Sequence, residues 1–207
     1  MSLELPQSLA RSGVMPLYAV VGEEDYLRDQ SVAALRAAAL GPAADTGFNY
    51  DIFHGDDCSV EDVLACAAEI PVFAERRVVV YKSVEKLPAR EGEKLLSYFA
   101  APNDTTTLIV VGVKLDGRMK WTQALTKGAV TVNCAPLRDA QLSTWIRQEA
   151  AALGVRLHEE ATQLLKEVGN ESLYAVKREL EKLAAYVPSD RTVQSVDVEA
   201  LRGTESG

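Results

Sequence analysis

The chain has 207 residues, which is enough for one large domain or two small ones and for a sizeable buried core. Hydrophobic residues make up 47% and charged residues 25%, a composition that excludes an intrinsically disordered or collagen-like chain. Lysine and arginine number 22 against 30 aspartate and glutamate residues, for a net charge of −8 that is spread along the chain. Because nucleic-acid backbones and anionic membranes attract clustered basic side chains, this balance disfavours autonomous binding to DNA or to a membrane.

The N-terminal segment and the cysteines both favour a cytoplasmic protein. The first residues lack the basic stretch and following apolar run of a secretory signal peptide. No apolar run reaches the ~18 residues of a membrane-spanning helix. The three cysteines, Cys58, Cys66 and Cys134, are an odd number without a CxxC pair, so no disulfide framework is expected.

Alternating strands and helices are predicted over the first two thirds of the chain. Short apolar runs typical of buried strands alternate with segments whose apolar residues recur at helical spacing. Ser59 with Asp62 three positions later resembles a capping box that starts one helix, which should end before Pro71. The other predicted elements are strands at 17–21, 50–53, 77–81, 107–111 and 129–133, and helices at 25–40, 91–99 and about 120–125.

This order predicts an α/β domain over residues 15–136, preceded by an N-terminal extension, residues 1–14. The strands are apolar throughout, which favours a doubly wound five-stranded parallel sheet with helices on both faces. After Pro136 the strand pattern stops, and residues 137–207 are predicted to form a small all-helical domain. Its predicted helices span 139–153, 158–168, from an Asn170 cap to about 186, and 195–201.

The turn after the first strand is where a doubly wound sheet would bind a nucleotide, but this turn lacks a phosphate-binding loop. Such a loop reads G-x-x-x-x-G-K-[ST], and its first glycine would be Gly22. The later required positions hold Leu27, Arg28 and Asp29 instead. Residues 23–25 are Glu-Glu-Asp, and three carboxylates in that place would repel phosphate oxygens.

No other motif predicts an enzyme, a cofactor or a metal site. His54, Cys58 and Cys66 lie within 13 residues, but their spacing matches no familiar zinc site. The only other histidine, His158, is interpreted as the start of a helix, and neither histidine lies in the context of a nucleophile elbow.

One local patch is positively charged. It contains Lys114, Arg118, Lys120 and Lys127, and Trp121 lies among them. Two interpretations are open: a solvated loop and helix face, or a surface that approaches a phosphate backbone or an acidic partner.

The connection from Ile70 to Arg77 contains two apolar side chains, Val72 and Phe73, directly after Pro71. Two interpretations are open here as well. The pair could cover the end of the preceding helix and complete the core. Alternatively, it could form an exposed plug for a pocket on a partner, where burial of a phenylalanine is worth about 1.5–3 kcal/mol.

Several segments, in their order and spacing over about residues 15–202, resemble the delta subunit family of bacterial DNA polymerase III. No single motif is diagnostic by itself. The segments that carry the resemblance are PLYAVVGEEDYL at 16–27, IPVFAERRVVV at 70–80, VEKL at 84–87, KLDGRMKW at 114–121, and 145–155, 168–170 and 180–183 in the second domain.

The resemblance implies an AAA+-like fold with a degenerate nucleotide site and a non-catalytic role in the clamp loader of replication. In that family an apolar pair, typically Leu-Phe, inserts into a hydrophobic pocket of the sliding clamp, the beta subunit. Carried onto this chain the pair is Val72 and Phe73, with Ile70 and Pro71 shaping the approach. Valine in place of leucine removes one methylene, about 0.8 kcal/mol of burial.

The resemblance also implies other clamp-loader subunits as partners, mainly through a third, C-terminal collar domain that this chain would lack. Contact with DNA is then expected only within the assembled complex, and ATP is hydrolysed by other subunits. Because the family is part of the polymerase III complex, the resemblance also implies a classification with DNA-directed DNA polymerase. Two alternatives stay open at this point: an active P-loop nucleotide hydrolase and an unrelated α/β interaction adaptor.

Overall fold

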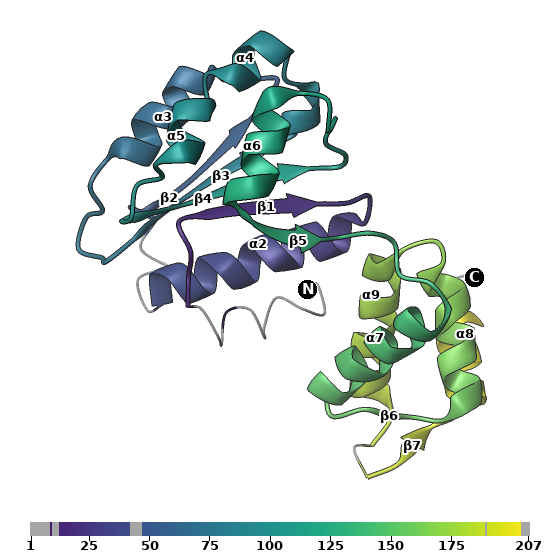
Figure 1. The fold of residues 1–207 in the computed structure, drawn as a ribbon. Helices are drawn as coiled ribbons and strands as arrows, with labels where there is room; N and C mark the ends of the chain where they lie inside the picture. Colours follow the sequence, from purple (N-terminus) through teal and green to yellow (C-terminus); the bar gives the residue numbers. More distant parts are fainter. Residues whose placement is uncertain (1–8, 10–12, 42–46, 189, 204–207) are drawn as a thin grey trace. The chain divides into compact units, whose positions relative to one another are not determined.

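The computed structural model describes residues 9, 13–41, 47–188 and 190–203 (Figure 1). The chain divides into two compact units, residues 1–136 and 137–207. Most of the expected N-terminal extension, residues 1–14, lies outside the described residues. None of the helices in the described part of the chain is long and apolar enough to cross a membrane.

A five-stranded parallel sheet forms the centre of the first unit, as the strand pattern predicts. Its strand order is β2-β3-β4-β1-β5, so β1 lies between β4 and β5, and β2 is an edge strand. All four pairings are parallel. The strands are β1 (Leu17–Val21), β2 (Tyr50–His54), β3 (Arg77–Lys82), β4 (Thr106–Gly112) and β5 (Val130–Asn133).

Helices cover both faces of this sheet, which explains why its central strands are apolar throughout (Figure 1). Helix α2 (Asp25–Leu40) lies on one face, and α3 (Val60–Ala68) and α6 (Lys120–Gly128) lie on the other. Successive strand residues point to opposite faces. The core on the α3 and α6 side is therefore built from alternate strand residues and the helices above them: Leu17, Ala19, Val79, Tyr81, Leu108, Val110, Val63, Ala67, Trp121 and Leu125.

The start of α3 confirms the predicted capping box. The Ser59 hydroxyl oxygen accepts a hydrogen bond from the Asp62 amide at 3.2 Å, and the Asp62 carboxylate accepts one from the Ser59 amide at 3.2 Å. Two amides that have no partner within the first turn are thereby satisfied, which stabilises the start of α3 at Val60.

The helix predicted at 91–99 is two short helices, α4 (Ala89–Glu93) and α5 (Leu96–Ala100). Between them the amides of Lys94 and Leu95 bond to carbonyls three residues back, at 3.1 Å each, so the chain is too tightly wound to continue as an α-helix. Gly92, a weak helix former, lies in the last turn of α4 just before this break, and the indole of Trp121 packs against it.

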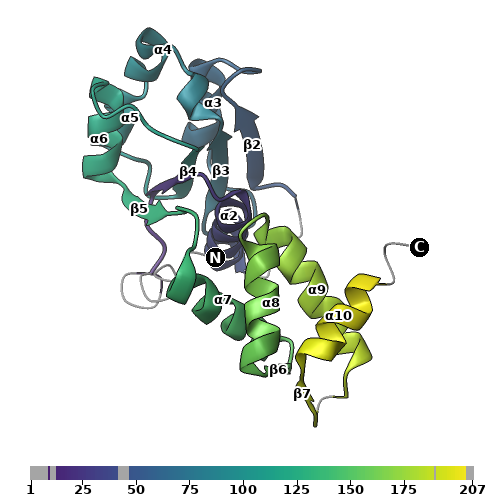
Figure 2. The same cartoon turned by 90° about the vertical axis from the view of Figure 1, so that its right-hand side faces the viewer.

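The second unit consists of α7 (Asp139–Ala152), α8 (Glu159–Gly169), α9 (Leu173–Tyr186) and α10 (Ser195–Gly203) (Figure 2). It also contains a short parallel pair that the sequence pattern does not predict, β6 (Arg156–Leu157) with β7 (Thr192–Val193). The core between the helices contains Leu142, Trp145, Ile146, Leu165, Val176, Leu180 and Leu183.

The cap predicted at Asn170 is wrong. Asn170 instead follows the end of α8, and Ser172 caps α9 by accepting a hydrogen bond from the Ala175 amide at 3.3 Å. Serine and asparagine are both good N-cap residues, so the choice between them depends on where α8 ends.

Replacing Gly92 by alanine should destabilise the first unit. An ideal Cβ at this position would lie 2.3 Å from Nε1 of Trp121, which is buried and cannot move without disturbing the core. We expect Gly92→Ala to lower the free energy of unfolding by about 1–3 kcal/mol, measured by urea denaturation. The matched control is Gly117→Ala, because a Cβ at Gly117 has no neighbour within 4 Å. Equal stability of Gly92→Ala and the unmodified chain would contradict the packing described here.

Candidate functional site

The connection between α3 and β3 exposes apolar side chains. Phe73 is 99% exposed and Ile70 is 84% exposed, whereas Val72 is 44% exposed and Pro71 is half-buried. We call these four residues, Ile70 to Phe73, the apolar tip. The phenyl ring of Phe73 makes no contribution to the core of the unit.

Phe73 has a left-handed backbone conformation, with φ at 54°. This conformation is unfavourable for a residue with a side chain, by roughly 1–2 kcal/mol. A conformation of this kind persists when the surrounding structure fixes the chain on either side. In the apolar tip, polar side chains hold the segment at two places.

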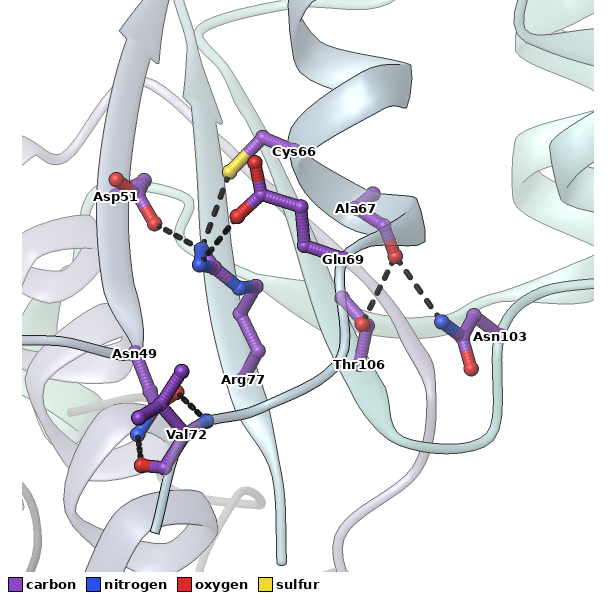
Figure 3. A network of polar contacts seen from close by, with 9 residues as sticks. All are labelled: Asn49, Asp51, Cys66, Ala67, Glu69, Val72, Arg77, Asn103 and Thr106. Atoms are coloured by element: carbon purple, nitrogen blue, oxygen red, sulfur yellow. Dashed lines mark hydrogen bonds and ion pairs between the residues drawn. The ribbon is translucent and has the colours of Figure 1, made fainter. Parts of the chain in front are cut away.

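The first attachment is the side chain of Asn49, which holds the main chain of Val72 (Figure 3). The Val72 amide donates to Oδ1 of Asn49 at 2.7 Å, and Nδ2 of Asn49 donates to the Val72 carbonyl at 2.8 Å. Asn49 is only 1% exposed, and its own carbonyl accepts a hydrogen bond from the Val78 amide at 2.8 Å. Val72 is therefore tied through Asn49 to β3.

The second attachment is the buried guanidinium of Arg77, at the start of β3. It donates to the Asp51 carboxylate at 2.7 Å and to the Glu69 carboxylate at 2.6 Å (Figure 3). Glu69 is the residue that follows α3, so the ion pair fixes the chain just before the apolar tip. Cys66 also accepts a bond from Arg77, at 3.5 Å.

The C-terminal end of α3 is held by the first residue of β4 and by a residue of the segment before it. The Ala67 carbonyl accepts a hydrogen bond from the Thr106 hydroxyl at 2.9 Å and one from the Asn103 side-chain amide at 3.2 Å (Figure 3). These bonds satisfy a carbonyl that has no partner within the helix. The apolar tip thus begins from a firmly fixed helix end.

The cysteines of this region are poor nucleophiles. Burial, together with the negative charge of Asp51, raises the pKa of Cys66 to about 11, so its thiol is protonated at neutral pH. Burial also raises the pKa of Cys58. Among the residues that the structure describes, no group of three or more histidine, cysteine and acidic side chains is placed to hold a metal ion.

The turn after β1 is occupied by the chain's own hydrogen bonds. The Glu24 amide donates to the Cys134 carbonyl at 2.9 Å, and the Arg28 side chain donates to the Gly22 carbonyl. A Cβ at Gly22 would lie 2.1 Å from the carbonyl carbon of Cys134, so only glycine allows this close approach. The Glu24 amide, which a phosphate loop would direct toward a nucleotide, is thereby directed toward the chain leaving β5.

The positive patch differs from a stacking platform for nucleic acid because Trp121 is buried, at 2% exposure. Lys114, Arg118, Lys120 and Lys127 are exposed, but Arg118 pairs with Asp116 at 2.7 Å. The hydrogen bonds from Arg118 lower the pKa of Asp116 to about 2, so this carboxylate stays ionised and offsets part of the charge. A cavity of about 450 Å³ lies beside the pair, lined by Glu85, Lys114, Leu115, Asp116, Gly117, Arg118, Met119 and Trp121.

The sequence pattern does not predict the two residues that hold the apolar tip. Asn49 precedes a short strand and resembles an ordinary turn residue, and Arg77 reads as the first residue of a strand. Their partners lie 23 and 26 positions away in the sequence, for Val72 and Asp51 respectively. Such contacts arise only when β2 pairs with β3.

Comparison with known proteins gives matches in both sequence and structure. The family profile for the DNA polymerase III delta subunit matches residues 18–135. The chain is 25% identical over 211 residues to DNA polymerase III subunit delta of Bacillus subtilis (strain 168), covering 97% of this chain and 60% of that protein. The solved DNA clamp loader delta protein of Bacillus subtilis is similar with a TM-score of 0.77 at 25% identity, over 97% of this chain and 62% of that one.

A more distant structure shares the fold alone. The RuvB P216G mutant of Thermotoga maritima is 15% identical, with a TM-score of 0.56 over 96% of this chain and 66% of that one. The chain spans about three fifths of the length of the two Bacillus relatives. The family profile covers more than half of the chain, and it includes both attachments of the apolar tip. This chain therefore belongs to the DNA polymerase III delta subunit family.

Proposed function

We propose that this chain is a non-catalytic clamp-loader subunit that binds the sliding clamp through its apolar tip and stabilises the open clamp for loading onto primed DNA. The observation that carries the proposal is Phe73, a fully exposed phenylalanine held beside Val72 on a segment with two polar attachments. An exposed aromatic side chain of this kind suits a pocket on a partner protein.

The physical basis of binding is burial of the apolar tip. In the free chain, Phe73 and Ile70 have most of their surface in water. Moving a phenylalanine side chain into an apolar pocket contributes about 1.5–3 kcal/mol, and Val72 and Ile70 add smaller amounts. The fixed segment also limits the conformational entropy that is lost when the complex forms.

Clamp opening requires a difference in affinity between two clamp shapes. A partner shifts an equilibrium only by the difference between its binding free energies for the two states. The apolar tip therefore has to fit the open or relaxed clamp better than the closed one. This mechanism uses no covalent step on the chain, and ATP would be hydrolysed by other subunits of the loader.

The proposed action takes place in the bacterial replisome, in the cytoplasm. The other clamp-loader subunits would be partners as well, mainly through the collar domain of the family. DNA would be contacted within the assembled complex rather than by this chain alone, in line with a net charge of −8 and with the Asp116 carboxylate beside Arg118.

Two alternative functions find less support. Against a nucleotide hydrolase, the Glu24 amide bonds to the Cys134 carbonyl, and Glu23, Glu24 and Asp25 occupy the turn. Against an unrelated α/β adaptor, the chain belongs to the delta subunit family.

The variant Val72→Ala/Phe73→Ala should bind the cognate sliding clamp more weakly than the unmodified chain by roughly 2–4 kcal/mol, about 30- to 700-fold in Kd. Loss of two buried side chains at the centre of the contact is the reason. Isothermal titration calorimetry of the 207-residue chain against the clamp measures this difference. Circular dichroism should show an unchanged fold, because the Phe73 side chain lies outside the core.

The control for this variant is Tyr186→Ala, which removes an aromatic side chain that is 60% exposed in the second unit. Its clamp affinity should match that of the unmodified chain. If the Kd for the clamp is the same in Val72→Ala/Phe73→Ala as in the unmodified chain, the contact with the clamp lies elsewhere on the chain.

Magnesium ATP should not stabilise the chain against heat. A nucleotide present at about 100 times its Kd would add roughly 2.7 kcal/mol to the free energy of unfolding and raise Tm. We expect no dependence of Tm on ATP concentration in the millimolar range, measured by differential scanning calorimetry, with ADP measured in parallel. A saturable rise in Tm would instead support the nucleotide hydrolase.

A further inference from the structure

We infer that Asn49 is the positioning residue of the apolar tip: its buried side-chain amide holds the main chain of Val72 and thereby keeps Phe73 in the conformation that the partner binds. This inference rests on the proposed function, because the binding event is the one proposed for the apolar tip. It adds a residue that lies 24 positions before Phe73 and has no surface of its own to offer a partner.

The chemistry of the position requires an amide. The main chain of Val72 has one donor, its N–H, and one acceptor, its carbonyl. The Oδ1 atom of Asn49 accepts from the N–H at 2.7 Å, and Nδ2 donates to the carbonyl at 2.8 Å. An aspartate would offer two acceptors and no donor at neutral pH, and a leucine would offer neither. The side chain of Asn49, directly before β2, therefore takes the place of a main-chain donor and acceptor opposite Val72.

The location of Asn49 makes the attachment rigid. The residue precedes the edge strand β2, and its carbonyl is bonded to the Val78 amide in β3. Its side chain is 1% exposed, so water does not compete for the amide. The attachment is consequently anchored to the sheet, while the residue that it holds, Val72, is 44% exposed and directly precedes Phe73 in the chain.

The conformation of Phe73 explains why an attachment is needed. Its φ of 54° is one that a phenylalanine rarely adopts, and a free segment would relax toward more favourable conformations. Ion pairing between Arg77 and Glu69 fixes the chain before the apolar tip, and Asn49 fixes it in the residue directly before Phe73. Apart from the two bonds to Asn49, no hydrogen bond among the described residues holds the main chain between Glu69 and Arg77.

The consequence for binding is a smaller fraction of competent molecules. When only a fraction of the chains has the binding conformation, the apparent Kd rises by the inverse of that fraction. Removal of Asn49 should therefore weaken clamp binding without removing any atom that touches the clamp. Its effect should also vanish when the ring of Phe73 is absent, because there is then no anchor left to position.

The first test measures the attachment in the chain alone. Hydrogen exchange by NMR should show a Val72 amide that exchanges at least about tenfold faster in Asn49→Ala than in the unmodified chain, while the amides of β4 keep their rates. The matched control is Asn103→Ala, which removes a similar side-chain bond, to the Ala67 carbonyl, but leaves Val72 attached. An unchanged Val72 amide in Asn49→Ala would overturn the inference.

The second test is a double-mutant cycle on clamp binding. We expect Asn49→Ala to raise the Kd about tenfold and Asn103→Ala to change it less than about twofold. On the Phe73→Ala background, Asn49→Ala should have less than about a twofold further effect. An equal loss on both backgrounds would show that Asn49 acts through general stability and would overturn the inference.

The two proposals fail in different ways. If Phe73→Ala itself leaves clamp binding unchanged, the proposed function of the apolar tip is wrong, and the role of Asn49 in binding falls with it. If Phe73→Ala weakens binding but Asn49→Ala does not, the proposed function stands and only the positioning role is wrong. Should Asn49→Ala fail to fold, Asn49→Ser replaces it with the same criteria, because its hydroxyl is too short to bridge both main-chain groups of Val72.

Discussion

The ion pairs of the buried Arg77 guanidinium are the interaction on which the end of the first unit that carries the apolar tip depends. The guanidinium joins β3 to β2 through Asp51 and to the end of α3 through Glu69, at 2.7 and 2.6 Å. A buried charge that loses its partners is strongly destabilising, so these elements stay together. The pair with Glu69 fixes the chain directly after α3, and the apolar tip begins at the next residue.

The apolar tip shows how a small unit can expose apolar surface without losing its fold. The core needs none of these side chains, because the buried face of α3 and alternate residues of the strands already fill it. The main chain of the apolar tip is instead held by polar groups, namely Asn49 at Val72 and Arg77 at Glu69. The apolar side chains therefore stay exposed, whereas hydrogen bonds and an ion pair stabilise the main chain that carries them.

The turn after β1, where a doubly wound sheet would bind a ligand, is filled by the chain's own hydrogen bonds. The sheet order places β1 in the interior, between β4 and β5, where a doubly wound sheet offers a ligand site at the ends of its strands. Here Gly22 lets the chain after β5 come so close that the Cys134 carbonyl takes the Glu24 amide. In this turn the Glu24 amide and the Gly22 carbonyl are bonded within the chain itself.

The sequence by itself determined the order of strands and helices, the covered parallel sheet, the cap at Ser59 and the family, because periodicity, capping and segment order are local properties of the chain. It also singled out Val72 and Phe73 but left them open between core and surface. The tertiary structure decided that Phe73 is exposed and that Trp121 is buried, since burial depends on what packs above a residue. In the tertiary structure the predicted helix 91–99 is also interrupted at Lys94 and Leu95, shortly after Gly92 packs against Trp121, and the cap is Ser172 instead of Asn170. The roles of Asn49 and Arg77 were beyond local patterns, because each depends on a contact that exists only once β2 lies beside β3.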